Sequence, residues 1–267
     1  MSKVIDTASL FSVSLPAKAG LQLQIASFDY SLIAAGMLLA CLAGISTSSL
    51  VDAIRLTQSV AGRGLAIATS GVVFGTGVFA MHYSAMLAMS FPAPVTFDLP
   101  QTVLSIVPAI VAGGISTAIM STPWPNVWRV ATASLSCAMG VGWMHNLGMT
   151  SMQGLSAIVL LPGGAIPLVL FMLLVYAVAW AVFLAFRQVP ALNGPFRPFG
   201  GTALGIAVSG SHFGAIANTE FYTQSSSSPL RAVAESAGTS GAAAIDIGVL
   251  IVILIVAVSL VSRPLLP

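Results

Sequence analysis

Three histidines, the only ones among the 267 residues, each lie inside a strongly apolar stretch of the chain. They are His82, His145 and His212. An ionisable side chain within a membrane segment is costly and therefore points to a function. Imidazole nitrogen binds zinc, copper, iron and nickel in proteins, so metal binding is the first chemistry that these residues indicate.

Methionines stand at the same two positions relative to the first two histidines, directly before and four residues after. They are Met81, Met86, Met144 and Met149. The third copy has Ser211 and Ile216 at these positions. On a helix, residues four apart share one face. Thioether sulfur is a soft ligand that favours Cu(I), so the set of three histidines and four methionines indicates copper ahead of zinc or iron.

Two other interpretations of the histidines remain open. Two of them could be the axial ligands of a haem in an electron-transfer subunit. Alternatively, the histidines could simply form hydrogen bonds to neighbouring helices, and the methionines could pack in the core of a structural membrane anchor. Three histidines at matched depth favour a metal site over a purely structural role, and the methionines and many small residues favour a compact metal site over haem.

Composition places the chain in a membrane. Hydrophobic residues make up 57% and charged residues 6%, and the mean hydropathy is +0.99. A soluble domain carries about 25% charged residues, so this chain is expected to be an integral membrane protein whose partner is the lipid bilayer. The net charge of +2 gives no reason to expect a nucleic acid. Both cysteines, Cys41 and Cys137, fall in apolar runs and are expected to be buried and unpaired.

An all-α membrane fold follows from the lengths of the apolar runs. A helix needs about 20 apolar residues to cross a bilayer. Seven segments qualify, at about residues 28–50, 65–90, 102–121, 130–150, 164–186, 200–219 and 242–262. We therefore predict a polar N-terminal tail over 1–27, a seven-helix membrane domain over 28–262, and a short C-terminal end over 263–267.

The basic residues between these segments predict the orientation. With seven spans, six arginines fall on one side: Arg55, Arg63, Arg129, Arg187, Arg197 and Arg263. Basic residues mark the cytoplasmic side, which predicts an N-terminus outside and a C-terminus inside a multi-pass bacterial inner-membrane protein. The histidines should then lie near the outer ends of alternate helices.

The spacing of the histidines also predicts an internal repeat. They are 63 and 67 residues apart, one helical hairpin each time. Small residues recur seven positions before and three positions after each histidine, and valine recurs four before. The residues seven before are Gly75, Ala138 and Gly205, and those three after are Ala85, Gly148 and Ala215. The valines are Val78, Val141 and Val208. Small residues let membrane helices approach closely, so we predict a threefold helical-hairpin repeat with one additional helix.

The segment Met81-His82-Tyr83-Ser84-Ala85-Met86 resembles the signature of the MHYT family of bacterial integral membrane sensor domains. The second copy keeps Met144, His145 and Met149, whereas the third keeps only His212 and an aromatic residue. The resemblance implies a seven-helix unit that binds copper and senses a diatomic gas such as O2, CO or NO.

We therefore expect a metal-binding sensor module that acts through a separate cytoplasmic or membrane partner. The chain ends at Pro267, soon after the last predicted helix, so no output domain is expected. No constellation for hydrolysis or phosphoryl transfer is visible, which predicts that the chain is not an enzyme. Copper transport, or copper delivery to a membrane metalloenzyme, is the alternative function.

Overall fold

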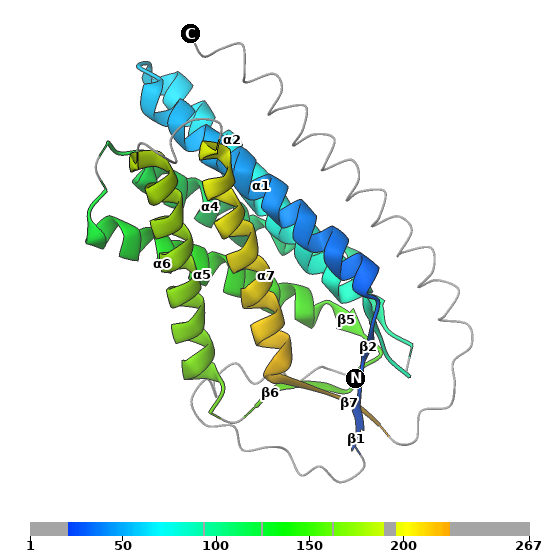
Figure 1. Cartoon of the computed structure of the whole chain (residues 1–267). Helices are drawn as coiled ribbons and strands as arrows, with labels where there is room; N and C mark the ends of the chain where they lie inside the picture. The colour runs from blue at the N-terminus through cyan, green and yellow to red at the C-terminus, as the bar shows by residue number, and fades with distance from the viewer. Residues whose placement is uncertain (1–20, 93, 124, 162, 190–195, 225–267) are drawn as a thin grey trace.

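Long helices dominate the computed structural model, which describes residues 21–92, 94–123, 125–161, 163–189 and 196–224 (Figure 1). The helices are α1 (Tyr30–Leu56), α2 (Val60–Leu87), α3 (Leu99–Leu104), α4 (Ile106–Met120), α5 (Val127–Thr150), α6 (Ala165–Gln188), the 3-10 turn η2 (Arg197–Gly201) and α7 (Thr202–Ala217). They match the first six predicted segments in order, the third being divided at Ser105 into α3 and α4. The seventh segment, 242–262, lies outside the described residues.

The first hairpin is longer than the sequence predicts. The prediction ends one helix near residue 50 and begins the next near residue 65, whereas only Thr57–Ser59 separates α1 from α2. Ser59 caps α2 by accepting a hydrogen bond from the Gly62 amide at 3.0 Å. Arg55 and Arg63 lie on the helices and are exposed. A long charged side chain near a helix end can reach water while its backbone stays helical, so these charges do not end the helices.

Four helical segments of the described chain are long and apolar enough to cross a membrane. They are Tyr30–Leu56, Val60–Leu87, Leu99–Met120 and Ala165–Gln188. The helices α5 and α7, which carry two of the histidines, are not in this group, and α7 has only 16 residues. The seven spans and their orientation therefore stay predictions.

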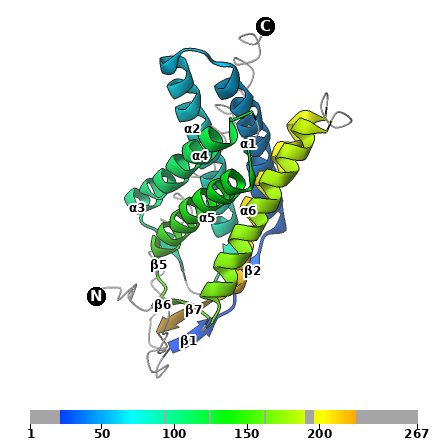
Figure 2. The same cartoon turned by 90° about the vertical axis from the view of Figure 1, so that its left-hand side faces the viewer.

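Short strands, which hydropathy alone does not reveal, gather at one end of the helices (Figures 1 and 2). They are β1 (Leu21–Gln24), β2 (Ser27–Phe28), β3 (Met89–Ser90), β4 (Thr96–Phe97), β5 (Met152–Gln153), β6 (Ala157–Leu160) and β7 (Thr219–Gln224). All pairs are antiparallel, with β2 on β3, β4 on β5, and β7 between β1 and β6. The described part of the expected polar tail, residues 21–27, therefore contains β1 and the first residue of β2.

These strands make the hairpin repeat visible in three dimensions. In each hairpin, the strand before the first helix pairs with the strand after the second helix. A backbone hydrogen bond recurs beside each pair: Asp29 to Ala88 at 2.9 Å, Asp98 to Ser151 at 2.9 Å, and Leu161 to Asn218 at 2.8 Å. The three acceptors each follow a histidine by six residues. Each hairpin is thus closed in the same way just beyond its histidine.

Aspartates cap the first helices of the first two hairpins. Asp98 accepts a hydrogen bond from the Gln101 amide at 2.9 Å. Asp29 accepts from the Ser31 amide at 2.9 Å and from the Ser31 hydroxyl. The Ser31 hydroxyl, followed by the backbone amides of Ser31 and Leu32, lowers the pKa of Asp29 below its ordinary value. The ionised carboxylate also interacts favourably with the positive end of the helix dipole.

Small residues let the hairpins pack closely, as the repeat predicts. A methyl group added at Gly75 of α2 would lie 2.6 Å from the backbone nitrogen of Ile110 in α4. One added at Gly205 of α7 would lie 2.5 Å from the Cα of Cys41 in α1. Both glycines occupy the position seven residues before a histidine, so each allows one hairpin to contact the next.

Candidate metal centre

The three histidines lie at equivalent points of three helices. His82 is on α2, His145 on α5 and His212 on α7, and each stands five residues before the last residue of its helix. The hairpin repeat gives these helices the same relation to the strands, which brings the three imidazoles to one depth. The three rings therefore lie at one level of the bundle, as expected, and their depth in a membrane stays a prediction.

Their ring nitrogens converge. The Nδ1 atom of His212 lies 3.0 Å from Nδ1 of His82 and 3.2 Å from Nδ1 of His145. Each residue has a ring nitrogen within 4.8 Å of those of the other two. His82 and His212 are buried, with 2% and 3% of their surface exposed, whereas His145 is partly buried. This group is the candidate metal centre.

The rings are arranged with approximate threefold symmetry. The three distances between ring centroids are 4.9, 5.1 and 5.1 Å, and the interplanar angles are between 75° and 82°. Every ring therefore meets its two neighbours edge-on, and one nitrogen of each ring lies close to a nitrogen of the other two. Among the described residues, no other group of three or more histidine, cysteine or acidic side chains has this arrangement.

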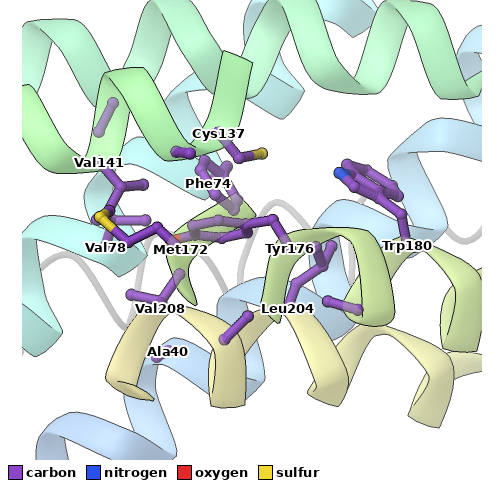
Figure 3. Packing of buried hydrophobic residues seen from close by; sticks show 14 of the residues in the cluster. Ala40, Phe74, Val78, Cys137, Val141, Met172, Tyr176, Trp180, Leu204 and Val208 are labelled. Atoms are coloured by element: carbon purple, nitrogen blue, oxygen red, sulfur yellow. The ribbon is translucent and has the colours of Figure 1, made fainter. Parts of the chain in front are cut away.

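An apolar layer lies on each side of the histidines. On one side lie Val78, Val141 and Val208, each 2% exposed. They belong to the main core, which is the largest cluster of buried side chains among the described residues. Figure 3 shows these valines gathered near the end of the Met172 side chain. On the other side, towards the strands, a separate buried cluster contains Met86, Met89, Met149, Met152, Leu155, Ile216 and Phe221. The histidine centre is therefore a polar layer between two apolar, buried layers.

The four candidate methionines divide between these two layers. Met86 and Met149 lie one helical turn beyond their histidines, in the cluster towards the strands. Ile216 holds the equivalent place in the third hairpin. Met81 and Met144, each 1% exposed, pack in the main core. Coordination of a metal by these sulfurs stays a prediction.

The outer edges of two imidazoles lack partners. The Nε2 atoms of His82 and His212 are buried and have no hydrogen-bond partner within the described ranges. Nε2 of His82 faces the backbone of α5 at Gly148, where an added methyl carbon would lie 2.2 Å away. Nδ1, and not Nε2, is therefore the atom that His82 presents to the centre.

Sequence reasoning missed a buried ion pair at the opposite end of the helices. Arg187, assigned to the cytoplasmic loops, is 8% exposed. Its Nε atom lies 3.0 Å from Oδ1 of Asp52 on α1, and its Nη1 atom donates to the Met120 carbonyl of α4 at 3.2 Å. Its guanidinium carbon lies 5.5 Å from the centre of the Phe183 ring. Two charges of opposite sign at the ends of apolar segments were the available signal.

Both cysteines are free thiols, as expected, but Cys41 is only partly buried. Cys137 of α5 is fully buried, and its sulfur lies 3.1 Å from the Ser116 hydroxyl of α4. Figure 3 shows the indole nitrogen of Trp180 turned towards this sulfur. The thiol belongs to the packing between hairpins and is not part of the histidine centre.

Comparisons with known proteins agree with the repeat. The model of the MHYT family, described as "Bacterial signalling protein N terminal repeat", matches residues 75–133, which include His82. The chain is 30% identical over 175 residues to the cyclic di-GMP phosphodiesterase NbdA of Pseudomonas aeruginosa, covering 66% of this chain and 21% of the relative. No solved structure matches it.

A second relative aligns over more of the chain. It is the bifunctional diguanylate cyclase/cyclic di-GMP phosphodiesterase MucR of Pseudomonas aeruginosa, 30% identical over 207 residues, or 74% of this chain and 29% of the relative. The chain thus spans less than a third of either relative. Together with the four apolar helices, the matches identify a membrane protein of bacterial signalling. Residues 75–133 carry an MHYT repeat, and the chain belongs to the MHYT family.

Proposed function

We propose that this chain is the sensor module of a bacterial inner-membrane signalling system and that it binds a copper ion at His82, His145 and His212. The convergence of the three Nδ1 atoms carries this proposal. In a tetrahedral site with metal–nitrogen distances of about 2.0–2.1 Å, ligand nitrogens lie about 3.3 Å apart. The separations of 3.0 and 3.2 Å are close to this spacing.

Hydrogen bonding alone satisfies these nitrogens poorly. A neutral imidazole nitrogen offers either one hydrogen or one lone pair. Nδ1 of His212 has two neighbouring Nδ1 atoms and can form one good hydrogen bond. A cation between the rings would accept all three lone pairs at once, which favours a metal centre over a purely structural cluster.

The surroundings favour copper. Imidazole suits several metals, but soft thioether sulfur favours Cu(I). Met86 and Met149 are buried one turn beyond the histidines, where they could supply such a sulfur. We propose that copper, when bound, offers an open position to a diatomic gas such as O2, CO or NO.

The relatives support a signalling role for the proposed module. Their names describe enzymes that make or degrade cyclic di-GMP, and the chain aligns with only a minor part of each. We propose that the aligned region is a sensory input and that, in this system, a partner protein supplies the output. A gas that binds one helix packing more tightly than another would shift the equilibrium between the two.

Metal analysis of detergent-purified protein, loaded with Cu(I) under reducing conditions, tests the site. We expect about one copper ion per chain, no haem absorption band, and loss of the ion in His82→Ala, His145→Ala and His212→Ala. Met172→Leu is the control, because Met172 packs in the main core and is not a proposed ligand.

Two results would refute parts of this proposal. Unchanged copper content in all three histidine variants would show that the histidines are structural. Copper flux into proteoliposomes that depends on the same histidines would favour transport over sensing. Spectral changes of the copper-loaded protein on addition of CO or NO test the gas ligand separately.

A further inference from the structure

The position three residues after each histidine holds alanine in two hairpins and glycine in one. Ala85 and Ala215 carry a methyl group there, whereas Gly148 on α5 does not. From the sequence, the small residues at this position predict only that neighbouring helices approach closely. The structure shows a more specific contact, because Gly148 lies against the ring of His82.

The contact leaves no room for a side chain. A methyl carbon built on Gly148 would lie 2.2 Å from Nε2, 2.9 Å from Cδ2 and 3.3 Å from Cε1 of His82. Carbon atoms in contact are normally about 3.5–4.0 Å apart. The Nε2 edge of the ring therefore rests on bare backbone, and His82 would have to move by more than 1 Å to accept even alanine.

This contact determines which nitrogen of His82 faces the centre. With Nε2 pressed against α5, Nδ1 points towards His212 at 3.0 Å. Ligand distances in a metal site tolerate changes of about 0.2 Å. A shift of the size that alanine requires would remove Nδ1 of His82 from the set of converging nitrogens.

We propose that Gly148 is a positioning residue for the metal centre: its missing side chain seats His82 so that Nδ1, and not Nε2, is the ligand. The inference rests on the proposed copper site. It also explains why the repeat departs from alanine at this position in the second hairpin.

Gly148→Ala tests the inference, with Gly142→Ala as the matched control on the same helix. A methyl at Gly142 would meet only the Met172 side chain, at an ordinary 3.5 Å from its methyl carbon. In competition with a chromogenic Cu(I) chelator, Gly148→Ala should weaken copper binding about 10- to 100-fold, the range for supporting residues of metal sites. X-ray absorption should show one imidazole fewer on copper, and Gly142→Ala should match the wild type in both.

A double-mutant cycle tests the contact without metal. Gly148→Ala should lower the melting temperature of the metal-free protein, but in a His82→Ala background it should be neutral or stabilising, because the ring is gone and alanine favours helix. If Gly148→Ala does not fold, the His82→Ala/Gly148→Ala protein should still fold.

The outcomes separate this inference from the proposed function. Wild-type copper affinity in Gly148→Ala, together with lost binding in His82→Ala, would overturn the positioning role and leave the metal site standing. Wild-type affinity in His82→Ala would overturn the metal site itself. If Gly148→Ala lowers the melting temperature equally in the wild type and in the His82→Ala background, the two residues do not clash and the inference fails. It also fails if the double variant does not fold.

Discussion

Replacing Arg187 with methionine should destabilise the bundle strongly, because it removes the guanidinium that faces the Asp52 carboxylate in the interior. The side chains of Arg187 and Asp52 are 5% and 18% exposed, and their charged atoms are 3.0 Å apart. Removing one member of a buried ion pair costs about 3–5 kcal/mol. Since Asp52 retains some contact with solvent, we expect the lower end of this range, about 3 kcal/mol.

The double variant separates the charge from the packing. Asp52→Asn alone removes the carboxylate that faces the guanidinium and should be destabilising for the same reason. Arg187→Met/Asp52→Asn removes both charges and keeps similar side-chain volume, so it should recover much of the loss. We expect a coupling energy of about 2 kcal/mol, within the range for residues in direct contact.

Unfolding by denaturant of protein reconstituted in lipid nanodiscs measures these differences. Arg129→Met is the control, because Arg129 is exposed in the first turn of α5, and its replacement should change stability by less than about 0.5 kcal/mol. A cost for Arg187→Met no larger than that of the control would refute the reasoning. The reasoning would also be refuted if the double variant lost as much stability as the two single variants together.

Three further predictions concern single positions. Because Ser31 lowers the pKa of Asp29, the ionised Asp29 side chain stabilises α1 fully above pH 3.8, the ordinary aspartate pKa, and this stabilisation is lost as the pH falls through the lowered pKa of Asp29. Measurement of unfolding at increasingly acid pH should show the loss in the wild type and not in Asp29→Asn. Tyr176 is fully buried, and its hydroxyl makes no hydrogen bond of good geometry in the described part of the chain. Tyr176→Phe should therefore stabilise the protein by about 1 kcal/mol; a lower melting temperature would show that the hydroxyl is satisfied. Gly75→Ala should lower the free energy of unfolding by about 1–3 kcal/mol through overpacking. Gly64→Ala, with nothing within 4 Å of the added methyl, should raise it by up to about 1 kcal/mol through helix propensity. Equal effects of the two changes would contradict the close packing of α2 on α4.

The histidine centre could be predicted from the sequence because three features agreed. The histidines were rare, they recurred at nearly constant spacing, and each lay in an apolar run. A repeat of constant length places equivalent residues at equivalent depth, so spacing alone was enough to predict that the imidazoles share one level. Which nitrogens would converge was beyond the sequence, since that depends on ring orientation and on contacts such as the one between His82 and Gly148.

Other parts of the structure left weaker signals. The strands have two to six residues each, and segments that short carry no hydropathy pattern distinct from a loop. Met81 and Met86 have the same chemistry and lie near the same histidine, yet they pack in different clusters. A residue next to histidine is turned about 100° away on a helix, whereas one four residues on shares its face, so periodicity favoured Met86 but did not establish a bond to metal.

The ion pair at the far end shows why a repeat can hide a contact as well as reveal one. Asp52 and Arg187 each follow the N-cap of their helix by 23 residues, and Met120 follows the N-cap Asp98 by 22. The three hairpins thus supply near-equivalent positions here too, but as a carboxylate, a backbone carbonyl and a guanidinium. Identical ligands that meet around a cation leave a repeated residue in the sequence. Opposite charges that satisfy one another need different residues in each copy, so the same geometry leaves no repeated signal.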